Sequence, residues 1–376
     1  MDKIEKIGKF EAITLLITLV ANNIIFNISS MVLNSTSTGA WVNIIYLSII
    51  SIIFILISSA LFKSFSNSDI IDVSEYLGGK FLKCIVAILY IIYFIGFSAL
   101  CLRYFSNSLQ LIYFKYSPLI FIMLLFVIPA IISNKAGLKA IVGVTRLSFP
   151  FTFFGIIILM FAASNDFVWQ YLFPAFGYGL DSVFINGLSN LFAFNVIGYL
   201  FLLKPMLKEE KHFKTISIVS VIICGIYILM SIISLLMTFP FIVETDEMFS
   251  IYLLTRLVSF GNFLQRVDAI FILLWIFIFL TFLSFNFYCI LKLFKKIFNV
   301  RHSTEMSYSL SVLVIGIALA FKDIRTVKYM FRNYLKLYAV ILIFVVSFII
   351  LLLAYLKKKK SRRKDMMKKW NINKSF

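Results

Sequence analysis

The chain has 376 residues, of which 61% are hydrophobic, and this composition excludes a soluble globular domain. Its formal net charge is +19, but most lysines and arginines lie between long apolar runs and in residues 357–374. Charge placed in this way is typical of the loops of a membrane protein rather than of a nucleic-acid-binding surface. The sequence therefore predicts an all-α polytopic membrane protein with no nucleic-acid partner.

Ten apolar runs are long enough to cross a bilayer as helices, at about 20 residues each. They lie at residues 10–33, 40–62, 82–108, 117–133, 137–163, 182–203, 215–239, 263–292, 307–321 and 335–356. Together they form a permease-like domain over residues 1–356, and residues 357–376 form a basic tail expected to contact anionic lipid. Residues 64–83 are charged and amphipathic, which predicts a segment at the membrane interface that ends at Gly78-Gly79.

The positive charges of the connections predict the orientation. Connections after the second, fourth, sixth and eighth spans are rich in lysine or arginine, which places both termini on the cytoplasmic side. One connection disagrees, because Lys322, Arg325, Lys328 and Arg332 fall on the predicted outer side. Either this loop is an outer contact surface, or the ninth run does not span the membrane.

Three asparagines interrupt the first apolar run. Asn22, Asn23 and Asn27 lie at bilayer depth, where unsatisfied polar groups are costly and compete with the helical ladder. One interpretation is a helix broken near residues 21–27 around a binding site. The alternative is an unbroken span whose asparagines bond to neighbouring helices. The sixth run is likewise interrupted by asparagine and glycine, at Asn186-Gly187 and Asn195, as a five-plus-five inverted repeat would require.

Other polar and aromatic residues inside the spans are candidates to line one ligand pocket with these asparagines. The candidates are Ile25, Phe26, Tyr93, Phe97, Phe194, Asn195, Thr281, Ser284 and Phe285. Thr281 and Ser284 share one helix face at a spacing of three residues. The alternative is ordinary polar contact between packed helices.

Four charged residues in or near the spans are candidates for gating or structural roles. Arg146 is within the third turn of the fifth run, where it either stays near a ligand or extends to the cytoplasmic surface. Arg256, Arg266 and Asp268 cluster at the predicted outer mouth of the eighth run, where we expect a gate or loop anchor. The four cysteines and two histidines have no metal-ligand spacing, so we predict no cofactor, no metal and no enzymatic activity.

Residues 254–261, Leu-Thr-Arg-Leu-Val-Ser-Phe-Gly, and residues 264–271, Leu-Gln-Arg-Val-Asp-Ala-Ile-Phe, precede Trp275. This stretch resembles the spore germination permease family, the B subunit of nutrient germinant receptors, with Gln265 and Asp268 at the two acidic positions of the family pattern. Gly137-Leu138 and the Pro174-x-x-Gly-x-Gly stretch are also similar. The resemblance covers nearly the whole chain.

The resemblance implies an amino acid–polyamine–organocation fold, similar to the leucine transporter, with the first and sixth helices broken around a small-molecule site. It also implies residence in the spore inner membrane, with a receptor A subunit and a lipoprotein C subunit as partners. The chain departs from the family at the first helix, where asparagines replace glycine-rich turns, and this leaves a different ligand open.

The leading hypothesis for function is a receptor subunit that binds a small germinant, expected to be an amino acid, and triggers germination by a shift between two packings. One alternative is a secondary amino-acid transporter. The absence of Asp or Glu at the centre of any predicted span disfavours proton coupling but leaves sodium coupling open. The other alternative is a scaffold subunit of the receptor that binds no ligand.

Overall fold

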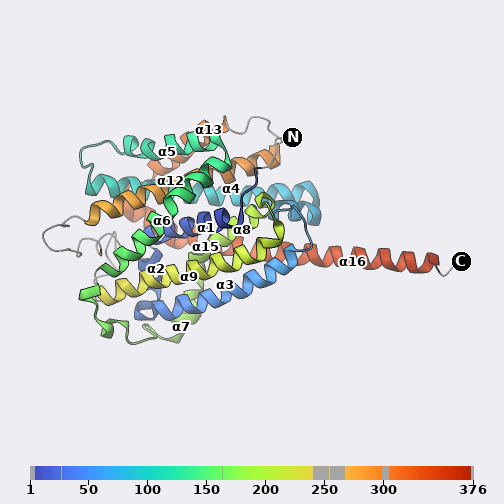
Figure 1. Cartoon of the computed structure of the whole chain (residues 1–376), viewed down its shortest axis with the longest axis horizontal. Helices are drawn as coiled ribbons and strands as arrows, with labels where there is room; N and C mark the ends of the chain where they lie inside the picture. Colours follow the sequence, from blue (N-terminus) through green and yellow to red (C-terminus); the bar gives the residue numbers. More distant parts are fainter. Residues whose placement is uncertain are drawn as a thin grey trace.

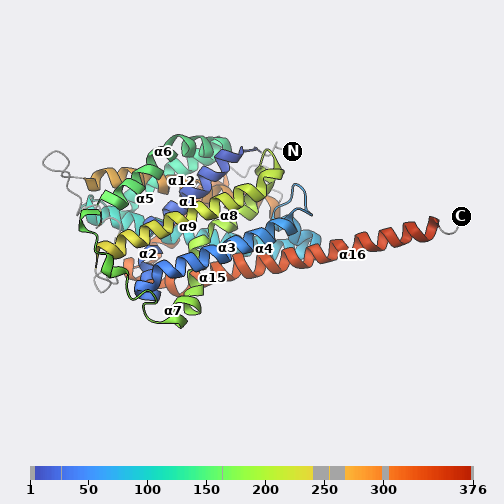
Figure 2. The same cartoon turned by 60° about the horizontal axis from the view of Figure 1, so that its bottom comes forward.

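The computed structural model describes residues 5–26, 28–162, 164–239, 254, 267–298 and 305–373. These residues are almost wholly helical, and their one extended pairing is a parallel bridge between Ile7 and Leu207. The long helices run side by side in an elongated bundle (Figure 1, Figure 2). Both termini lie at the end of the bundle where α16 (Ser347–Asn373) leaves it, which we call the terminal end. The opposite end, where α7 (Leu180–Phe184) lies, is the loop end.

Long apolar helices show that the chain is an integral membrane protein. Seven stretches are long and apolar enough to cross a membrane: Ile28–Phe62, Ile70–Ile112, Leu119–Ala136, Leu138–Asp166, Glu210–Thr238, Ala269–Phe298 and Ile324–Ser361. A bent pair, Leu180–Phe194 and Val196–Met206, forms an eighth candidate with an angle of 44°. The division into ten spans also counts α1 (Lys9–Ile25) and α13 (Met306–Ala320), and it stays a prediction.

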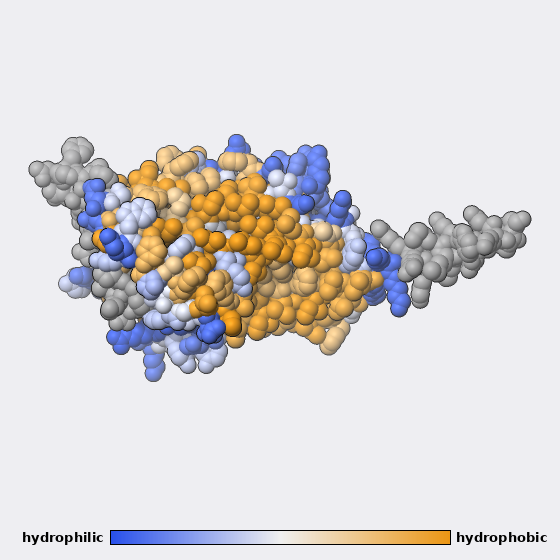
Figure 3. Space-filling view, turned by 90° about the horizontal axis from the view of Figure 1, so that it is seen from below, coloured by the Kyte–Doolittle hydropathy of each residue, from blue (hydrophilic) through white to orange (hydrophobic). Residues whose placement is uncertain are grey.

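The outer surface of the bundle matches a lipid environment. On α3 (Ala40–Phe62), the exposed side chains include Ile45, Ile49, Ile53 and Ile57, which recur every four residues along one helix face. Figure 3 shows hydrophobic residues over the middle of the molecule and hydrophilic residues toward its two ends. Lipid chains would cover such a band, and headgroups and water would cover its edges.

α1 occupies the centre of the bundle and is buried along nearly its whole length. It packs against α6 (Leu138–Ala162), α9 (Phe213–Thr238) and α12 (Val267–Phe298). α12 in turn packs against α4 (Ile70–Ile112), α5 (Leu119–Ala136) and α6, whereas α3 packs mainly on α9. The polar residues of the first span therefore face protein on all sides.

Two spans are discontinuous, as the sequence predicts. α1 ends at Ile25, Phe26 has ψ of 12°, and α2 (Ile28–Thr36) begins after it. The sixth span consists of α7, a 3₁₀ segment at Asn186–Phe194 and α8 (Val196–Leu203). The interpretation of the first span as an unbroken helix is therefore wrong.

Two further helices depart from regular geometry. α4 has non-helical backbone at Gly78 and Gly79, and the φ of +70° at Gly79 favours glycine, so the amphipathic segment ends where the sequence predicts. The last span contains α14 (Ile324–Met330), a π turn, α15 (Lys336–Val340), a second π turn and α16. α16 continues as a helix through much of the basic segment 357–376.

Candidate ligand site at the two helix breaks

A chain of hydrogen bonds links the two breaks to α4. The Asn23 amide nitrogen donates to the carboxamide oxygen of Asn195 at 2.7 Å, and the Asn195 amide nitrogen donates to the Tyr93 hydroxyl at 3.1 Å. Asn23 belongs to the last turn of α1, and Asn195 lies between the 3₁₀ segment and α8. All three side chains are buried. Three elements thus converge at the point where two of them are interrupted.

Buried acceptors beside this chain have no hydrogen-bond partner within the described residues. They are the carboxamide oxygens of Asn22 and Asn23, and the hydroxyl of Ser98 on α4 is also unpaired. The Asn22 amide nitrogen lies 4.0 Å from the Cys101 sulfur, which is a weak acceptor. A buried polar group without a partner costs about 1–3 kcal/mol. The two oxygens are therefore suited to accept hydrogen bonds from a ligand with N–H groups.

Aromatic rings enclose the break on the side of the last span. The Phe26 ring lies 6.1 Å from Phe97 and 4.8 Å from Phe331, between ring centroids. Phe331 also meets Phe192 of the 3₁₀ segment at 4.8 Å, and Phe97 meets Phe282 of α12 at 5.0 Å. These five rings, which we call the aromatic cap, join the broken spans to α4, α12 and the last span. The sequence indicated Phe26 and Phe97 but not the other three.

The predicted residues of α12 are buried, and their described contacts are with α5 and α8. Thr281 and Ser284 are buried, and the Ser284 carbonyl accepts a hydrogen bond from the Asn134 amide on α5 at 3.0 Å. The Phe285 ring lies 5.8 Å from Tyr199 of α8, whose hydroxyl donates to Asn286 at 2.6 Å. α12 therefore reaches the site through Phe282 and reaches α8 through Phe285 and Asn286.

The remaining predicted residues differ in their placement. Ile25 is buried at the end of α1. The Phe194 ring approaches Gly225 of α9, 3.6 Å from where a β-carbon would stand there, so it faces α9. Asn27, Arg256 and Arg266 lie outside the described residues, as does the Asp268 side chain.

Arg146 lies at the terminal end, away from the breaks. It is exposed and lines a surface cavity of about 330 Å³ with Lys9, Glu11 and Lys208. α1 separates Lys9 from Asn23 by about 20 Å at 1.5 Å per residue. This placement fits the interpretation in which Arg146 extends to the surface rather than holding a ligand at the break.

A second buried polar cluster, which the sequence did not indicate, lies on the loop-end side of the breaks. The Lys336 ammonium on α15 donates to the Asn190 carboxamide oxygen at 2.5 Å. The Asn190 amide nitrogen donates to Asn43 at 2.9 Å and to the Ser35 hydroxyl at 3.0 Å, and the Asn43 amide donates to the Val183 carbonyl at 2.6 Å. The cluster joins the last span to both broken spans and to α3.

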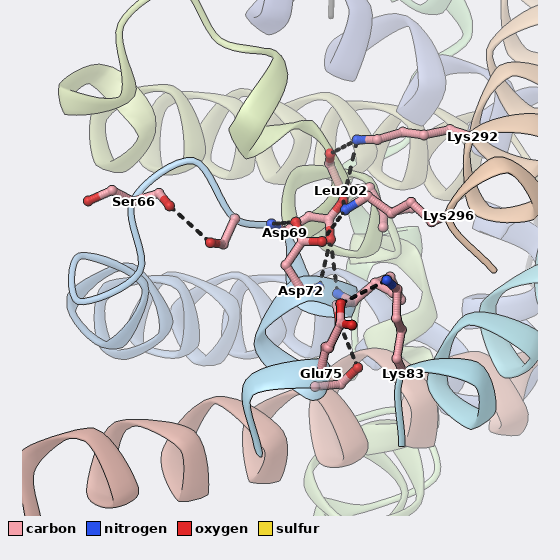
Figure 4. A network of polar contacts seen from close by, with 11 residues as sticks. Ser66, Asp69, Asp72, Glu75, Lys83, Leu202, Lys292 and Lys296 are labelled. Atoms are coloured by element: carbon pink, nitrogen blue, oxygen red, sulfur yellow. Dashed lines mark hydrogen bonds and ion pairs between the residues drawn. The ribbon is translucent and has the colours of Figure 1, made fainter. Parts of the chain in front are cut away.

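An ionic cluster lies near the terminal end, where α4 begins (Figure 4). Asp69 caps α4 by accepting the backbone N–H groups of Ile71 and Asp72, each at 3.1 Å. Its carboxylate also pairs with Lys296 at 2.6 Å and Lys292 at 3.4 Å, both on α12. Burial alone would raise the pKa of Asp69, but the two ammonium groups and the hydrogen bonds lower it to about 2. The Asp69 carboxylate thus stays charged and holds α12 against the start of α4.

The two broken spans are also tied together at the terminal end. The Ile7 N–H donates to the Met206 carbonyl at 2.8 Å, and the Lys208 N–H donates to the Ile7 carbonyl at 2.9 Å. Lys204, next to α8, donates to the carbonyls of Phe62 and Phe65. The bonds of Ile7 connect the residues before α1 to those after α8, and the bonds of Lys204 connect α8 to the end of α3.

These features define a polytopic helical membrane protein with two discontinuous helices that meet at a buried polar centre. Its fold is similar to the solved structure of a Na⁺-coupled sialic acid symporter in a substrate-bound, outward-open state. The two share 11% sequence identity with a TM-score of 0.64, over 90% of this chain and 79% of that one. The similarity confirms the expected leucine-transporter-like fold class.

The chain belongs to the family described as "Spore germination protein", whose sequence model matches residues 6–327. Spore germination protein B2 of Bacillus subtilis (strain 168) is 23% identical over 178 residues, which are 47% of this chain and 48% of that protein. Spore germination protein KB of the same organism is 19% identical over 317 residues, or 79% and 82% of the two chains. The match thus spans about half the length of protein B2. The family expected from the motifs is confirmed.

Proposed function

We propose that this protein is a membrane subunit of a spore nutrient germinant receptor, which binds a small amino-acid germinant at the two helix breaks and thereby triggers germination. The observation that carries the proposal is the hydrogen-bonded chain from Asn23 through Asn195 to Tyr93, with unpaired acceptors on Asn22 and Asn23 beside it. Binding sites of transporter folds lie at such midplane interruptions. The family membership supports the germination role.

The chemistry of the site fits a ligand with an ammonium group and a small apolar part. The carboxamide oxygens of Asn22 and Asn23 accept N–H donors, and the Phe26 and Phe97 rings offer apolar wall and negatively polarised ring faces. Because no described carboxylate lies in this chain of contacts, the site recognises the ammonium with neutral dipoles. Glycine-rich turns would leave more room, so the asparagines favour a short ligand.

Binding would act as a trigger by differential affinity for two packings of the bundle. A ligand that replaces the bond between Asn23 and Asn195 loosens α1 from α8 at the break, while Ile7 and Met206 keep the spans joined at the terminal end. The two spans would then pivot about that tie. In the proposed receptor, the A subunit and the lipoprotein C subunit bind this chain and respond to the movement. The complex would reside in the spore inner membrane, with both termini of this chain on the cytoplasmic side and the basic tail against anionic lipid.

The test uses the full-length chain in lipid nanodiscs and each proteinogenic L-amino acid as a ligand. We expect at least one amino acid to raise the melting temperature, because a ligand at a hundred times its Kd stabilises by about 2.7 kcal/mol. Asn195→Trp should fill the site and Asn195→Leu should remove its hydrogen bonds, and both should abolish the shift. Asn186→Trp is the matched control, because Asn186 is an exposed asparagine at the start of the same 3₁₀ segment.

Two results would count against the proposal. A shift that survives in folded Asn195→Trp and Asn195→Leu protein would place the ligand elsewhere in the chain. No shift of the wild-type chain by any amino acid would remove the amino-acid ligand and favour the scaffold role. Uptake of a stabilising amino acid into proteoliposomes, driven by a sodium gradient, would instead support the transporter role.

A further inference from the structure

Lys336 is a buried cation without an anionic partner in the described chain. The residue is only 6% exposed, and the one bond that its ammonium makes to described residues is to the neutral side chain of Asn190. No described carboxylate forms an ion pair with it. An ammonium has three donors, so two are left for another acceptor. Buried charges in membrane spans are rare and are usually paired, which makes Lys336 a candidate functional residue.

The backbone next to Lys336 departs from regular α-helical geometry. A π turn at Phe331–Leu335 directly precedes it, and π turns occur frequently at functional sites. Phe331, which begins this turn, is a member of the aromatic cap over Phe26. The π turn therefore begins with Phe331, whose ring covers the break, and ends directly before Lys336, which carries the buried ammonium.

The surface that leads to Lys336 is positively charged. Arg332 is exposed one helical turn before it, and Lys322 and Arg325 are exposed near the start of the same span. On the predicted ten-span topology, these residues belong to the connection that departs from the positive-inside pattern, which membrane insertion does not account for. Asp323, which is also exposed, lies between Lys322 and Arg325, so the group carries a net positive charge, and such a charge beside a low-dielectric interior attracts anions.

We propose that Lys336 forms an anion-binding subsite, beside Asn190 and on the loop-end side of Asn195, that receives the carboxylate of an incoming ligand. Asn190 positions the ammonium, and Asn43 and Ser35 hold Asn190 through its own amide. The 3₁₀ segment separates Asn190 from Asn195 by about 10 Å at 2 Å per residue, too far for one α-amino acid to touch both. A ligand would therefore bind at this subsite first and move to the break afterwards. Only this second step rests on the proposed function.

The test uses sodium acetate as the probe and needs no knowledge of the germinant. The full-length chain in nanodiscs is melted in sodium acetate, in sodium chloride of equal ionic strength and in acetamide, which has the same shape without the charge. We expect a saturable rise in melting temperature with acetate alone. In Lys336→Gln the apparent Kd for acetate should rise about 10- to 100-fold, as expected for the loss of a charge-assisted hydrogen bond. Lys336→Arg should retain the response.

Asn190→Asp tests the same subsite if Lys336→Gln fails to fold. It loses the amide donor to Asn43 but places a carboxylate against the ammonium, so it should abolish the acetate response. An acetate response equal to that of chloride in the wild-type chain, or unchanged in Lys336→Gln or Asn190→Asp, would overturn the inference. Asn195→Trp separates this inference from the proposed function, because it should leave the acetate response intact while abolishing the amino-acid response.

Discussion

The ionic cluster at the start of α4 gives a prediction whose size can be worked out. Asp69→Asn keeps the side-chain oxygen that caps α4 but removes the buried charge between Lys292 and Lys296, so two partly buried ammonium groups lose a partner. Breaking a buried pair typically costs about 3–5 kcal/mol. The cost here should lie near the lower end, because Lys296 keeps Asp72 at 2.6 Å.

The pKa of Asp69 supports the same size of effect. A fall from the ordinary 3.8 to about 2 corresponds to about 2 kcal/mol of stabilisation. Because the folded pKa is the lower one, this stability is fully present above about pH 4 and is lost as the pH falls toward 2. Asp69 should therefore contribute no change in stability between pH 8 and pH 5.

The assay is thermal unfolding of the full-length chain in nanodiscs, followed by tryptophan fluorescence. A chain of 376 residues has an unfolding entropy of roughly 0.8 kcal/mol/K by the soluble-protein scale, so 2–3 kcal/mol should lower the melting temperature by about 3 °C. Asp69→Ala should lower it further, because the cap is lost as well. Asp166→Asn, at an exposed position, is the control. An unchanged melting temperature in Asp69→Asn would refute the assignment of the cluster as a stabilising contact.

Three smaller predictions follow from single contacts. Gly177→Ala should lower the melting temperature, because φ is +48° and a β-carbon would lie 2.2 Å from the Thr36 carbonyl oxygen; an unchanged value would mean that this loop packs differently. Tyr93→Phe removes one hydrogen bond of the site and should weaken amino-acid binding about 2- to 10-fold in the nanodisc titration, whereas unaltered affinity would exclude the hydroxyl from the site. Lys211 lowers the pKa of the exposed Glu209 carboxylate. Because salt and water screen an exposed ion pair, Glu209→Gln should still leave the melting temperature unchanged at 0.15 M salt, and a clear fall would contradict this.

The sequence indicated where the two breaks could lie because polar residues contrast with apolar surroundings, but it left an unbroken first helix open. Asn23 and Asn195 each interrupt a long apolar run, and the structure joins these two side chains directly. Tyr93 was indicated for the same reason. Gly78-Gly79 marked the end of the amphipathic part of α4 because consecutive glycines rarely continue a helix.

The aromatic cap could not be predicted in full from the same contrast. Phe192, Phe282 and Phe331 are apolar residues among 43 phenylalanines, and nothing in their local sequence separates them from lipid-facing rings. Phe194 was a pocket candidate as an aromatic residue inside the sixth span, but its ring lies against α9. The 3₁₀ segment has three residues per turn, so a face worked out with 3.6 residues per turn does not apply there.

Lys336 was overlooked because it lies at the edge of its apolar run. A lysine one residue inside the expected start at residue 335 resembles an ordinary interfacial residue that extends to the headgroups. In the structure the helical stretch begins at Ile324, so position 336 is a full three turns inside it. The burial depends on contacts with Asn190 and its neighbours in other spans, which only the folded chain brings together.

The measurement that tests the central claim most directly is nutrient-dependent germination of spores that carry Asn23→Trp, with the level of the protein checked by blot. The proposed site predicts a normal level of protein and no response to nutrient, because the indole would remove the bond from Asn23 to Asn195 and occupy the position of the ligand. Spores with Asn186→Trp should respond as the wild type does. A normal level of Asn23→Trp protein with a normal response would contradict a ligand site at the helix breaks.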